Sequence, residues 1–472
     1  MAKNDVLAAQ FATTVLNNNA STSPHRTING TLYRYSPDHG RYISLSAGQL
    51  EHELCREFDV FMQEPAAFYR KTVKEFLLRA PRLGPTECPQ AVLFKNRQIL
   101  SDKASVRDWV LLQNGIFRFS KFAKGKRHFT RCHPRFFTKA VRPFAYDPTA
   151  QCPLWLDCLA QWLDVPSIKL LQEWMGYTCV FDSSMERFGI FLGPSRTGKS
   201  TVANVQEYLL GTDNISNLGL ERFSGNFGLE ELAEKLLNVS ADIGNLPVVA
   251  EGQIKAISSR DRISFDRKHK SAINIRPESR LLFIGNHMPR FKDRSKAIRD
   301  RALIIAFDRS VPPNKRDRYL GDKLRAEISG IFNWSMEGLR RLRETQAFTV
   351  PPRMVEELEQ MKYLANPALE YLEDYVEASE AGIVPTRRLF ESYDLWCRRN
   401  GLSGRDVSNV RELGKMLKQL FPDVRKADKR IGPAKIKVYY GITIHDQDPP
   451  NRFRISDLRT EETPEEKINE AC

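Results

Sequence analysis

The feature that most constrains this chain is the stretch Gly-Pro-Ser-Arg-Thr-Gly-Lys-Ser at 193–200, which fills every fixed position of the pattern G-x-x-x-x-G-K-[ST]. An apolar run at 188–192 precedes it, as expected of a buried strand, and a stretch with helical spacing follows it as far as Gly211. Strand, glycine loop and helix in this order turn backbone N–H groups and a helix N-terminus toward a phosphate chain. The chain is therefore predicted to bind a nucleoside triphosphate.

Two side chains of this loop have roles that follow from the pattern. We expect the Lys199 ammonium to reach the β- and γ-phosphates and the Ser200 hydroxyl to bind Mg²⁺. The alternative is a glycine-rich turn with a chance lysine, which the complete match and both flanks argue against. The residues expected around the phosphates are Gly193, Pro194, Ser195, Arg196, Thr197, Gly198, Lys199, Ser200 and Thr201.

Length and charge narrow the class of protein. With 472 residues the chain is long enough for about three domains. Its net charge of +14 favours a polyanionic partner such as nucleic acid, and the alternative is a basic protein without one. The eight cysteines form no C-x-x-C pair, no long apolar run could span a membrane, and the first residues lack a secretory signal pattern. These features predict a protein of the cell interior, in the cytoplasm of a bacterial or other host cell.

Changes in hydrophobic spacing and composition along the chain predict five parts. An N-terminal α/β region covers 1–148, a helical collar 149–186, a P-loop domain 187–349, a winged-helix domain 350–445 and a polar tail 446–472. Strands and helices alternate in the P-loop domain, which predicts an α/β fold with a parallel sheet and a site at its carboxyl edge. The collar is a candidate oligomerisation element.

One N-terminal segment, 121–131, is basic with interleaved aromatic residues. This mixture is typical of a strand pair that touches a nucleic-acid backbone, and a solvated hairpin is the alternative. His128, Cys132 and His133 lie close together in the sequence, but no fourth ligand stands at a zinc-like spacing, so we expect no metal site there.

Polar residues follow the later strands of the P-loop domain. The strand at 237–242 ends on Asp242, which is placed to hold Mg²⁺ through water. The strand at 280–286 ends on Asn286, whose amide could orient the attacking water or touch the γ-phosphate. Between them lie a helix that carries Glu251 and a charged, turn-like stretch at 261–270.

In this order the motifs resemble those of the superfamily 3 helicases, and more narrowly the helicase part of the phage, plasmid and poxvirus primase–helicase family. The resemblance covers about residues 105–310 and extends more loosely into the C-terminal part. The segments that carry it are 193–200, 238–242, 254–257, 261–268, 281–289 and 301–307, with Asn114-Gly-Ile, Tyr146-Asp-Pro, Cys152-Pro-Leu-Trp-Leu and Gly176-Tyr upstream.

The resemblance implies an AAA+ ATPase with ATP and Mg²⁺ as cofactors, assembled as a homo-hexameric ring. Such a ring encircles DNA and moves with 3′ to 5′ polarity. Nucleotide would lie between subunits, with Asp242 orienting the metal shell, Asn286 sensing the γ-phosphate, and an arginine of the neighbour stabilising the transferring phosphoryl group. Arg301 fits the family position best and Arg299 is second; the alternative is that either pairs on the surface with Asp300 or Asp293.

Further residues are expected to touch DNA. A hairpin with Lys268, His269 and Lys270 would line the ring channel, and a merely solvated turn is the alternative. The family often has a second acid beside the metal-strand acid, but here Ile243 follows Asp242. Asp242 and Glu251 therefore both stay candidates for the catalytic base. No paired aspartates of a polymerising primase precede the domain, so we expect a stand-alone helicase that works with a separate primase or host replication proteins.

The C-terminal pattern predicts helices at 354–365, 367–379, 385–400 and 407–420, then a basic hairpin at 428–441. Helix, turn, helix and basic hairpin are typical of a winged helix, which binds DNA or, alternatively, protein. The side chains expected to contact duplex DNA are Arg411, Lys415, Lys418, Lys435 and Lys437.

The leading hypothesis is a replicative DNA helicase of a phage, plasmid or other mobile element that binds single- and double-stranded DNA. The main alternative is an origin-binding initiator in which ATP drives assembly and melting without processive unwinding. A small-molecule kinase would leave the basic hairpin and the C-terminal domain unexplained.

Overall fold

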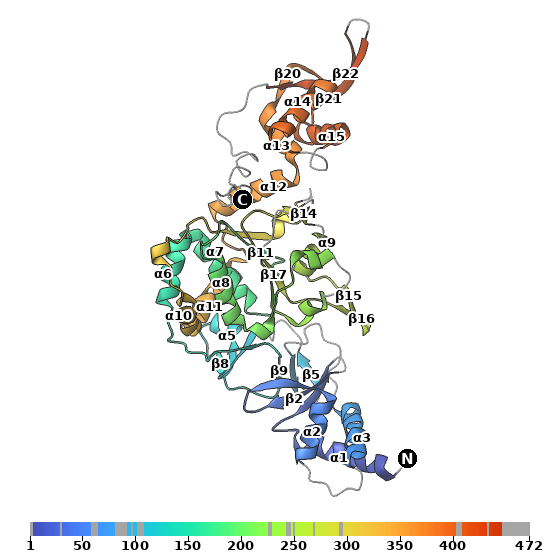
Figure 1. The fold of residues 1–472 in the computed structure, drawn as a ribbon, viewed down its shortest axis with the longest axis vertical. Helices are drawn as coiled ribbons and strands as arrows, with labels where there is room; N and C mark the ends of the chain where they lie inside the picture. Colours follow the sequence, from blue (N-terminus) through green and yellow to red (C-terminus); the bar gives the residue numbers. More distant parts are fainter. Residues whose placement is uncertain are drawn as a thin grey trace, which may run out of the picture. The chain divides into compact units, whose positions relative to one another are not determined.

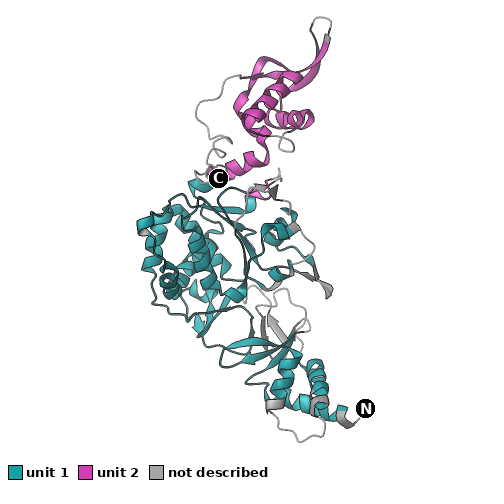
Figure 2. Cartoon of the chain, viewed as in Figure 1, with its two compact units in different colours: residues 1–245, 249–288, 300–355 teal, residues 246–248, 289–299, 356–472 magenta. Residues whose placement is uncertain are grey.

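A computed structural model describes most of the chain, in two compact units (Figure 2). The first unit consists of residues 1–245, 249–288 and 300–355, and the second of 246–248, 289–299 and 356–472. The residues whose structure is described are 3–28, 31–57, 65–80, 92–95, 98–101, 108–224, 229–241, 247–248, 251–267, 270–291, 296–402, 408–431 and 434–445.

A five-stranded parallel sheet forms the centre of the first unit, with the order β12-β13-β17-β11-β19. Every neighbouring pair is parallel, as the alternation of strands and helices predicted. The P-loop strand β11 is therefore internal, between β17 and β19. The strands are β11 (Phe188–Leu192), β12 (Ile215–Ser216), β13 (Leu237–Ser240), β17 (Arg280–Gly285) and β19 (Ala302–Ala306).

Both faces of this sheet are covered, which explains why β11, β17 and β19 are almost continuously apolar. On one face Gly189 leaves room for the indole of Trp174, because a Cβ at Gly189 would lie 2.9 Å from that ring. On the other face Phe283 contacts Phe188 and Phe223 edge-on. Side chains of a strand alternate between the two faces, so a strand buried on both sides reads as one apolar run.

Helices α7, α8 and α11 lie together beside the sheet (Figure 1). Helix α7 packs along α11 so closely that a Cβ at Gly176 or Gly338 would overlap the backbone of the facing helix. The helices expected to form a separate collar are thus part of the core of the sheet domain, and a role in assembly stays a prediction. The helices around the sheet are α6 (Pro153–Trp162), α7 (Val165–Thr178), α8 (Lys199–Leu210), α9 (Glu251–Ser258), α10 (Leu320–Ala326) and α11 (Ile328–Thr345).

The N-terminal region is mixed α/β, as predicted. The hairpin expected at 31–43 is formed by β2 and β3, and Gly40 closes its turn with φ +60°. The helix α1 was not predicted. The elements here are α1 (Lys3–Asn18), β1 (His25–Ile28), β2 (Thr31–Ser36), β3 (Arg41–Leu45), α2 (Ala47–Glu57), α3 (Pro65–Arg79), β4 (Val92–Lys95), β5 (Gln98–Ser101), β6 (Trp109–Leu112), β7 (Gly115–Arg118), α5 (Phe119–Phe122), β8 (Phe129–Thr130), β9 (Phe136–Phe137) and β10 (Val141–Arg142).

The prediction of a strand pair within 121–131 is wrong. A short helix, α5, opens the segment, and only Phe129–Thr130 extends as a strand, paired with β7 rather than with its own segment. The aromatic residues that suggested strands pack inward instead: Phe117 contacts the rings of Phe122 and Phe332.

A clamp joins α7, α11 and the chain that leaves α11. The Glu173 carboxylate is buried and accepts hydrogen bonds from Arg341 Nε at 2.7 Å, from the Thr349 N–H at 2.7 Å and from the Thr349 hydroxyl at 2.8 Å. A buried carboxylate is tolerated only when it is paired and hydrogen-bonded in this way. Glu173 therefore fixes Thr349 to the core of the first unit.

A second group of charged side chains, half-buried, surrounds Arg343 of α11. Its guanidinium lies 2.5 Å from Asp182 and 3.4 Å from Asp108. Burial raises the pKa of Asp108 to about 6, although Arg343 opposes this shift and Asp182 adds to it. Asp182 keeps a lowered pKa, because Arg343 and hydrogen bonds from Ser184 outweigh its burial.

The C-terminal unit contains an antiparallel sheet of order β20-β22-β21 packed against α13, α14 and α15. The helix expected at 367–379 ends at Tyr375, where the chain turns into the strand β20, which was not predicted. Its elements are α13 (Pro367–Tyr375), β20 (Val376–Pro385), α14 (Thr386–Arg399), α15 (Val410–Leu420), β21 (Arg425–Ile431) and β22 (Ala434–Ile444), after α12 (Pro352–Ala365).

Smaller strands complete the described chain: β14 (Pro247–Val248) pairs with β18 (Arg290–Phe291), and β15 (Ile263–Arg267) pairs with β16 (Lys270–Ile275). No helix among the described residues is long and apolar enough to cross a membrane.

Candidate nucleotide-binding site

The loop 193–198 leaves β11 at the carboxyl edge of the sheet and enters α8. Both its glycines have backbone angles that side chains rarely adopt, with φ +140° at Gly193 and +98° at Gly198. Each is also crowded: a Cβ at Gly193 would overlap the Phe307 carbonyl oxygen, and one at Gly198 would lie 2.5 Å from the ring of Trp162. Glycine is therefore required at both positions by conformation and by space.

The N-terminus of α8 is built to receive an anion. Gly198 caps the helix without a side-chain hydrogen bond, so no side chain of the cap occupies the first N–H groups. These N–H groups have no acceptor within the helix and lie at the positive end of its dipole. Ser200 is exposed and Thr201 half-buried in this first turn. A hydroxyl and free N–H groups suit a phosphate chain and the oxygen-ligated shell of Mg²⁺.

Lys199 reaches back across the loop. Its side chain is buried, with the residue 7 % exposed, and its ammonium donates to the carbonyl oxygens of Gly193 and Pro194. The Thr197 hydroxyl donates to the same Pro194 oxygen at 2.9 Å and tightens the turn. The Lys199 ammonium therefore points at the backbone of the loop. The side chains of Pro194, Ser195 and Arg196 are exposed.

Asn286, one of the two expected strand-end residues, lies at the same edge. Leu192, the last residue of β11, pairs with Gly285, the last residue of β17. Asn286 therefore follows β17 as Gly193 follows β11, and the Asn286 side chain is exposed. The strand β13 ends at Ser240, and Asp242, the expected metal acid, lies outside the described residues. Parallel strands bring these carboxyl ends to one edge, which is where ligands bind in open α/β sheets.

Asn238 was not singled out as a site residue, but it shapes the β13 side of this edge. Its fully buried amide accepts from the Leu218 N–H at 2.9 Å and from the Ser216 hydroxyl at 2.9 Å, and it donates to the Leu218 oxygen at 3.1 Å. It thus ties the loop after β12 to the strand that leads to Asp242. A polar residue inside an apolar strand was the sequence signal for it.

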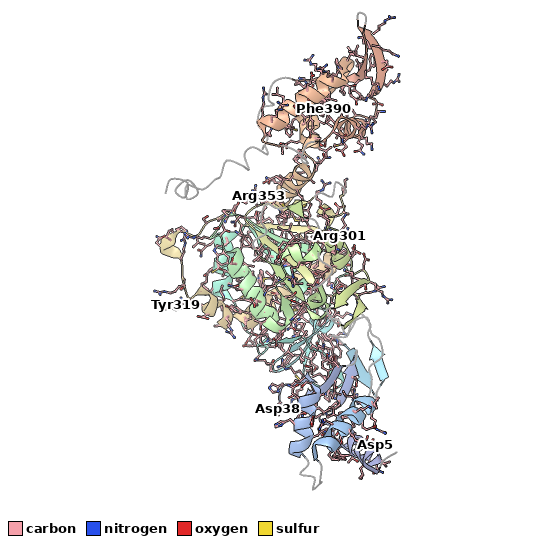
Figure 3. The ribbon with its side chains drawn as sticks, turned by 45° about the vertical axis from the view of Figure 1, so that its right-hand side comes forward. Asp5, Asp38, Arg301, Tyr319, Arg353 and Phe390 are labelled. Atoms are coloured by element: carbon pink, nitrogen blue, oxygen red, sulfur yellow. The ribbon has the colours of Figure 1, made fainter. Side chains whose placement is uncertain are left out.

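Arg301 lies at the opposite edge of the sheet. It directly precedes β19, and its guanidinium donates to Glu186 at 3.0 Å and to the Ser259 hydroxyl at 2.9 Å (labelled in Figure 3). Glu186 in turn stands just before β11. Glu186 is thus an ion-pair partner of Arg301, and Asp293, one of the two acids of the alternative surface pairing, lies outside the described residues.

Other expected residues are less closely tied to this edge. Glu251 is the first residue of α9 and half-buried, and Arg299 opens the short 3-10 turn that leads to β19. The hairpin expected around 268–270 is formed by β15 and β16, in which Arg267 pairs with Lys270. Lys268 and His269 lie outside the described residues, and the role of the hairpin stays a prediction.

In the second unit the three expected helix cations share an exposed face. Arg411, Lys415 and Lys418 are exposed on α15, whereas its Leu413, Met416 and Leu417 are buried. The Asn409 side chain caps this helix by accepting from the N–H groups of Arg411 and Glu412, both at 3.0 Å. Lys435 and Lys437 are exposed on β22, and Lys435 forms an ion pair with Asp428 at 3.1 Å.

No cluster of three or more His, Cys, Asp or Glu side chains that could hold a metal exists in the part of the chain that the structure describes. His128 instead bonds the Tyr146 hydroxyl at 2.8 Å, and His133 accepts from the Arg135 N–H at 3.0 Å.

Together the parallel sheet and this loop define an α/β protein with a glycine loop between a strand and a helix at the carboxyl edge of the sheet. Two family models match parts of the chain: residues 191–301 match a family of unknown function (DUF5906), and residues 365–448 match the Poxvirus D5 protein-like family. An apo structure of the NrS-1 C-terminal region has a TM-score of 0.52 at 10% identity and covers 93% of this chain and 100% of that chain. An A-form apo structure of the same region has a TM-score of 0.51 at 9% identity and covers 91% and 98%.

At this level of identity the likeness to the NrS-1 C-terminal region shows a shared fold. The match at 365–448 is independent of it and relates the C-terminal unit to Poxvirus D5 protein-like sequences. The two findings therefore concern the shared fold and the family likeness of residues 365–448.

Proposed function

We propose that this protein is an ATP-dependent replicative DNA helicase of the superfamily 3 type, acting as a homo-oligomeric ring with 3′ to 5′ polarity. The observation that carries the proposal is the loop between β11 and α8, with two crowded left-handed glycines and Lys199 folded across it. Many phosphate-binding proteins share such a loop. The match of the C-terminal unit to Poxvirus D5 protein-like sequences favours the helicase among them.

In the proposed reaction the loop residues bind and orient the triphosphate. The N–H groups at the start of α8 donate to its phosphate oxygens, and Lys199 exchanges the carbonyls of Gly193 and Pro194 for them. Bound Mg²⁺ supplies charge neutralisation between the phosphates, with Ser200 and Asp242 as the residues that would hold it. Asn286, at the end of the neighbouring strand, orients the attacking water.

Arg301 supports a site shared between subunits. It precedes β19, whereas the loop follows β11 at the other edge of the same sheet. We therefore propose that Arg301 serves the nucleotide of a neighbouring chain, as a charge that stabilises the transferring phosphoryl group. The hairpin β15–β16 would then carry its lysines to DNA in the ring channel.

The C-terminal unit supports a DNA-binding role for the second domain. Helix, strand, two helices and two strands follow one another from α13 to β22, with exposed cations on α15 and on the last strand. We propose a winged helix in which α15 enters the major groove and the β21–β22 hairpin meets phosphates. Its protein-binding alternative would leave duplex affinity unchanged when these cations are removed.

Strand displacement on forked duplexes tests the function. We expect displacement with ATP on substrates with a 3′ tail, none on substrates with only a 5′ tail, and none from the Lys199→Ala variant. Tight duplex binding with slow hydrolysis and no displaced strand would refute the helicase and favour the origin-binding initiator. Particle images with DNA and an ATP analogue give the number of subunits.

A further inference from the structure

The segment from Trp109 to Tyr146 is the most one-sidedly charged part of the described chain. It contains no acidic residue, because Asp108 and Asp147 are the nearest acids on either side, and it contains nine Lys and Arg residues. Six of these cations are exposed, and we name them the cationic patch. They are Lys121, Lys124, Lys126, Arg127, Arg131 and Arg135.

No carboxylate among the described residues pairs with the cationic patch, whereas some other exposed cations of the first unit have such partners. On α3, for example, Lys71 lies 3.0 Å from Asp5, and Arg79 lies 3.0 Å from Glu75. Like charges placed together without counter-charges repel one another and destabilise the folded chain. A surface that keeps them is best explained by a polyanion that they bind.

The backbone under the patch is held in a defined shape. After α5 the chain reverses through Gly125, whose φ is +62°, and the Lys126 N–H donates to the Lys121 oxygen at 2.9 Å. The Arg118 N–H donates to the His128 oxygen at 2.8 Å and closes the base of the turn. Three of the six cations, Lys124, Lys126 and Arg127, therefore stand on one short, hydrogen-bonded turn between α5 and β8 (Figure 1), and Lys121 lies in α5 just before it.

Aromatic packing fixes this turn to the core. The imidazole of His128 bonds the Tyr146 hydroxyl at 2.8 Å and stands edge-on to the rings of Phe117 and Phe122. Further along, the Tyr42 hydroxyl donates to the Pro134 oxygen at 2.6 Å and ties the segment that carries Arg131 and Arg135 to the N-terminal sheet. A preorganised surface loses little conformational entropy when it binds.

The chemistry of the patch selects the class of partner. Its aromatic residues point inward, and none of the described residues between Trp109 and Tyr146 is a large apolar side chain exposed to solvent. Protein interfaces depend on buried apolar and aromatic anchors, and single-strand platforms depend on stacking rings; the patch offers neither. Cations alone suit a phosphate backbone, read without sequence preference.

We propose that the cationic patch is a sequence-independent binding surface for the phosphate backbone of nucleic acid. It is separate from the β15–β16 hairpin and from the C-terminal unit, and it needs neither ATP nor unwinding. The proposal therefore stands even if the protein proves not to be a helicase.

The test removes three cations at the tip of the turn in the full chain, as Lys124→Gln, Lys126→Gln and Arg127→Gln together. The matched control removes three exposed cations of α3, as Lys71→Gln, Lys74→Gln and Arg79→Gln. Binding to a labelled 20-nucleotide single strand and to a labelled duplex is measured by fluorescence anisotropy between 50 and 300 mM NaCl without nucleotide. Thermal melting checks that both variants fold.

We expect the patch variant to bind about tenfold or more weakly near 100 mM salt, because each lost phosphate contact also removes counterion release. The slope of log K against log salt should fall by about two to three units, and by less than one in the control. Equal affinity and slope in the two variants would overturn the proposal. Binding of both variants to poly-glutamate is measured in the same way. A patch variant that keeps its nucleic-acid affinity but loses poly-glutamate binding would also overturn the proposal, because that result assigns the patch to an acidic protein.

Discussion

Replacing Arg301 by alanine tests whether one sheet can serve two nucleotide sites. Arg301 stands one residue before β19, and Ala306, at the end of that strand, pairs with Leu192 just before the loop. Five residue steps along a strand span about 16 Å, whereas an extended arginine side chain reaches about 7 Å. Arg301 therefore cannot contact a phosphate bound in its own loop.

If a neighbour's phosphate is its target, the Arg301→Ala variant should bind ATP normally and hydrolyse it about a thousandfold more slowly, a loss of about 4 kcal/mol in transition-state stabilisation. Mixing it with Lys199→Ala chains restores some interfaces, because an intact loop can then face an intact arginine. Random assembly makes one interface in four complete, so the equimolar mixture should recover about a quarter of the wild-type rate. ATPase rates across mixing ratios measure this.

Two variants serve as controls for this experiment. Glu186→Gln removes the ion-pair partner of Arg301, and since the pair is partly exposed and worth about 0–1 kcal/mol, the rate should stay within about fivefold of wild type. Arg299→Ala should also remain active. No recovery on mixing, although assemblies form, would refute a shared site; loss of activity in Arg299→Ala alone would move the role to Arg299.

Three further predictions concern the site and its support. Gly198→Ala should weaken ATP binding, measured by nucleotide titration, by more than tenfold. It should also lower the free energy of unfolding in urea by about 1–2 kcal/mol from its backbone angle alone. Unchanged ATP affinity would contradict the conclusion that the space beside Trp162 requires glycine. Asn238→Ala should lower the free energy of unfolding by about 2–4 kcal/mol, because the buried N–H and carbonyl oxygen of Leu218 lose their hydrogen bonds. A loss below about 0.5 kcal/mol would contradict this role of Asn238. The pKa of Asp108 is raised to about 6, so its contribution to stability is present at low pH and is lost as pH rises from about 4 to about 6, by up to about 3 kcal/mol. Asp108→Asn should remove that fall from the unfolding free energy, and an identical pH profile in both proteins would contradict the shifted pKa.

The sequence predicted those features that local patterns encode. The strand at 188–192, the loop and the helix after it occur as predicted, because fixed glycines and a complete apolar run leave few alternatives. Asn286 was placed correctly at the end of its strand because a buried strand must stop where polar residues begin. For β15–β16 the residues themselves indicated only a charged, turn-like stretch, and the hairpin was expected from the resemblance to superfamily 3 helicases.

Other features depended on contacts that no local pattern carries. The aromatic residues within 121–131 suggested a strand pair, but Phe122 packs against Phe117, which also contacts Phe332 of α11, far away in the sequence. From the sequence Trp162 is an ordinary core residue, and only the structure shows that its ring lies against Gly198. Glu186 became visible as the partner of Arg301 only when two parallel strands brought their starting ends together. The strand β20 was missed because its pairing partner β22 lies about sixty residues later.

The clamp at Glu173 has a mechanical consequence. Beyond α11 the main chain is held at Thr349, whose N–H and hydroxyl donate to the Glu173 carboxylate of α7. Tension applied to the C-terminal unit would travel along the backbone to this point. From there it would pass into α7, whose Trp174 rests on the P-loop strand. A load on the C-terminal unit would thus be delivered to the strand beneath the loop.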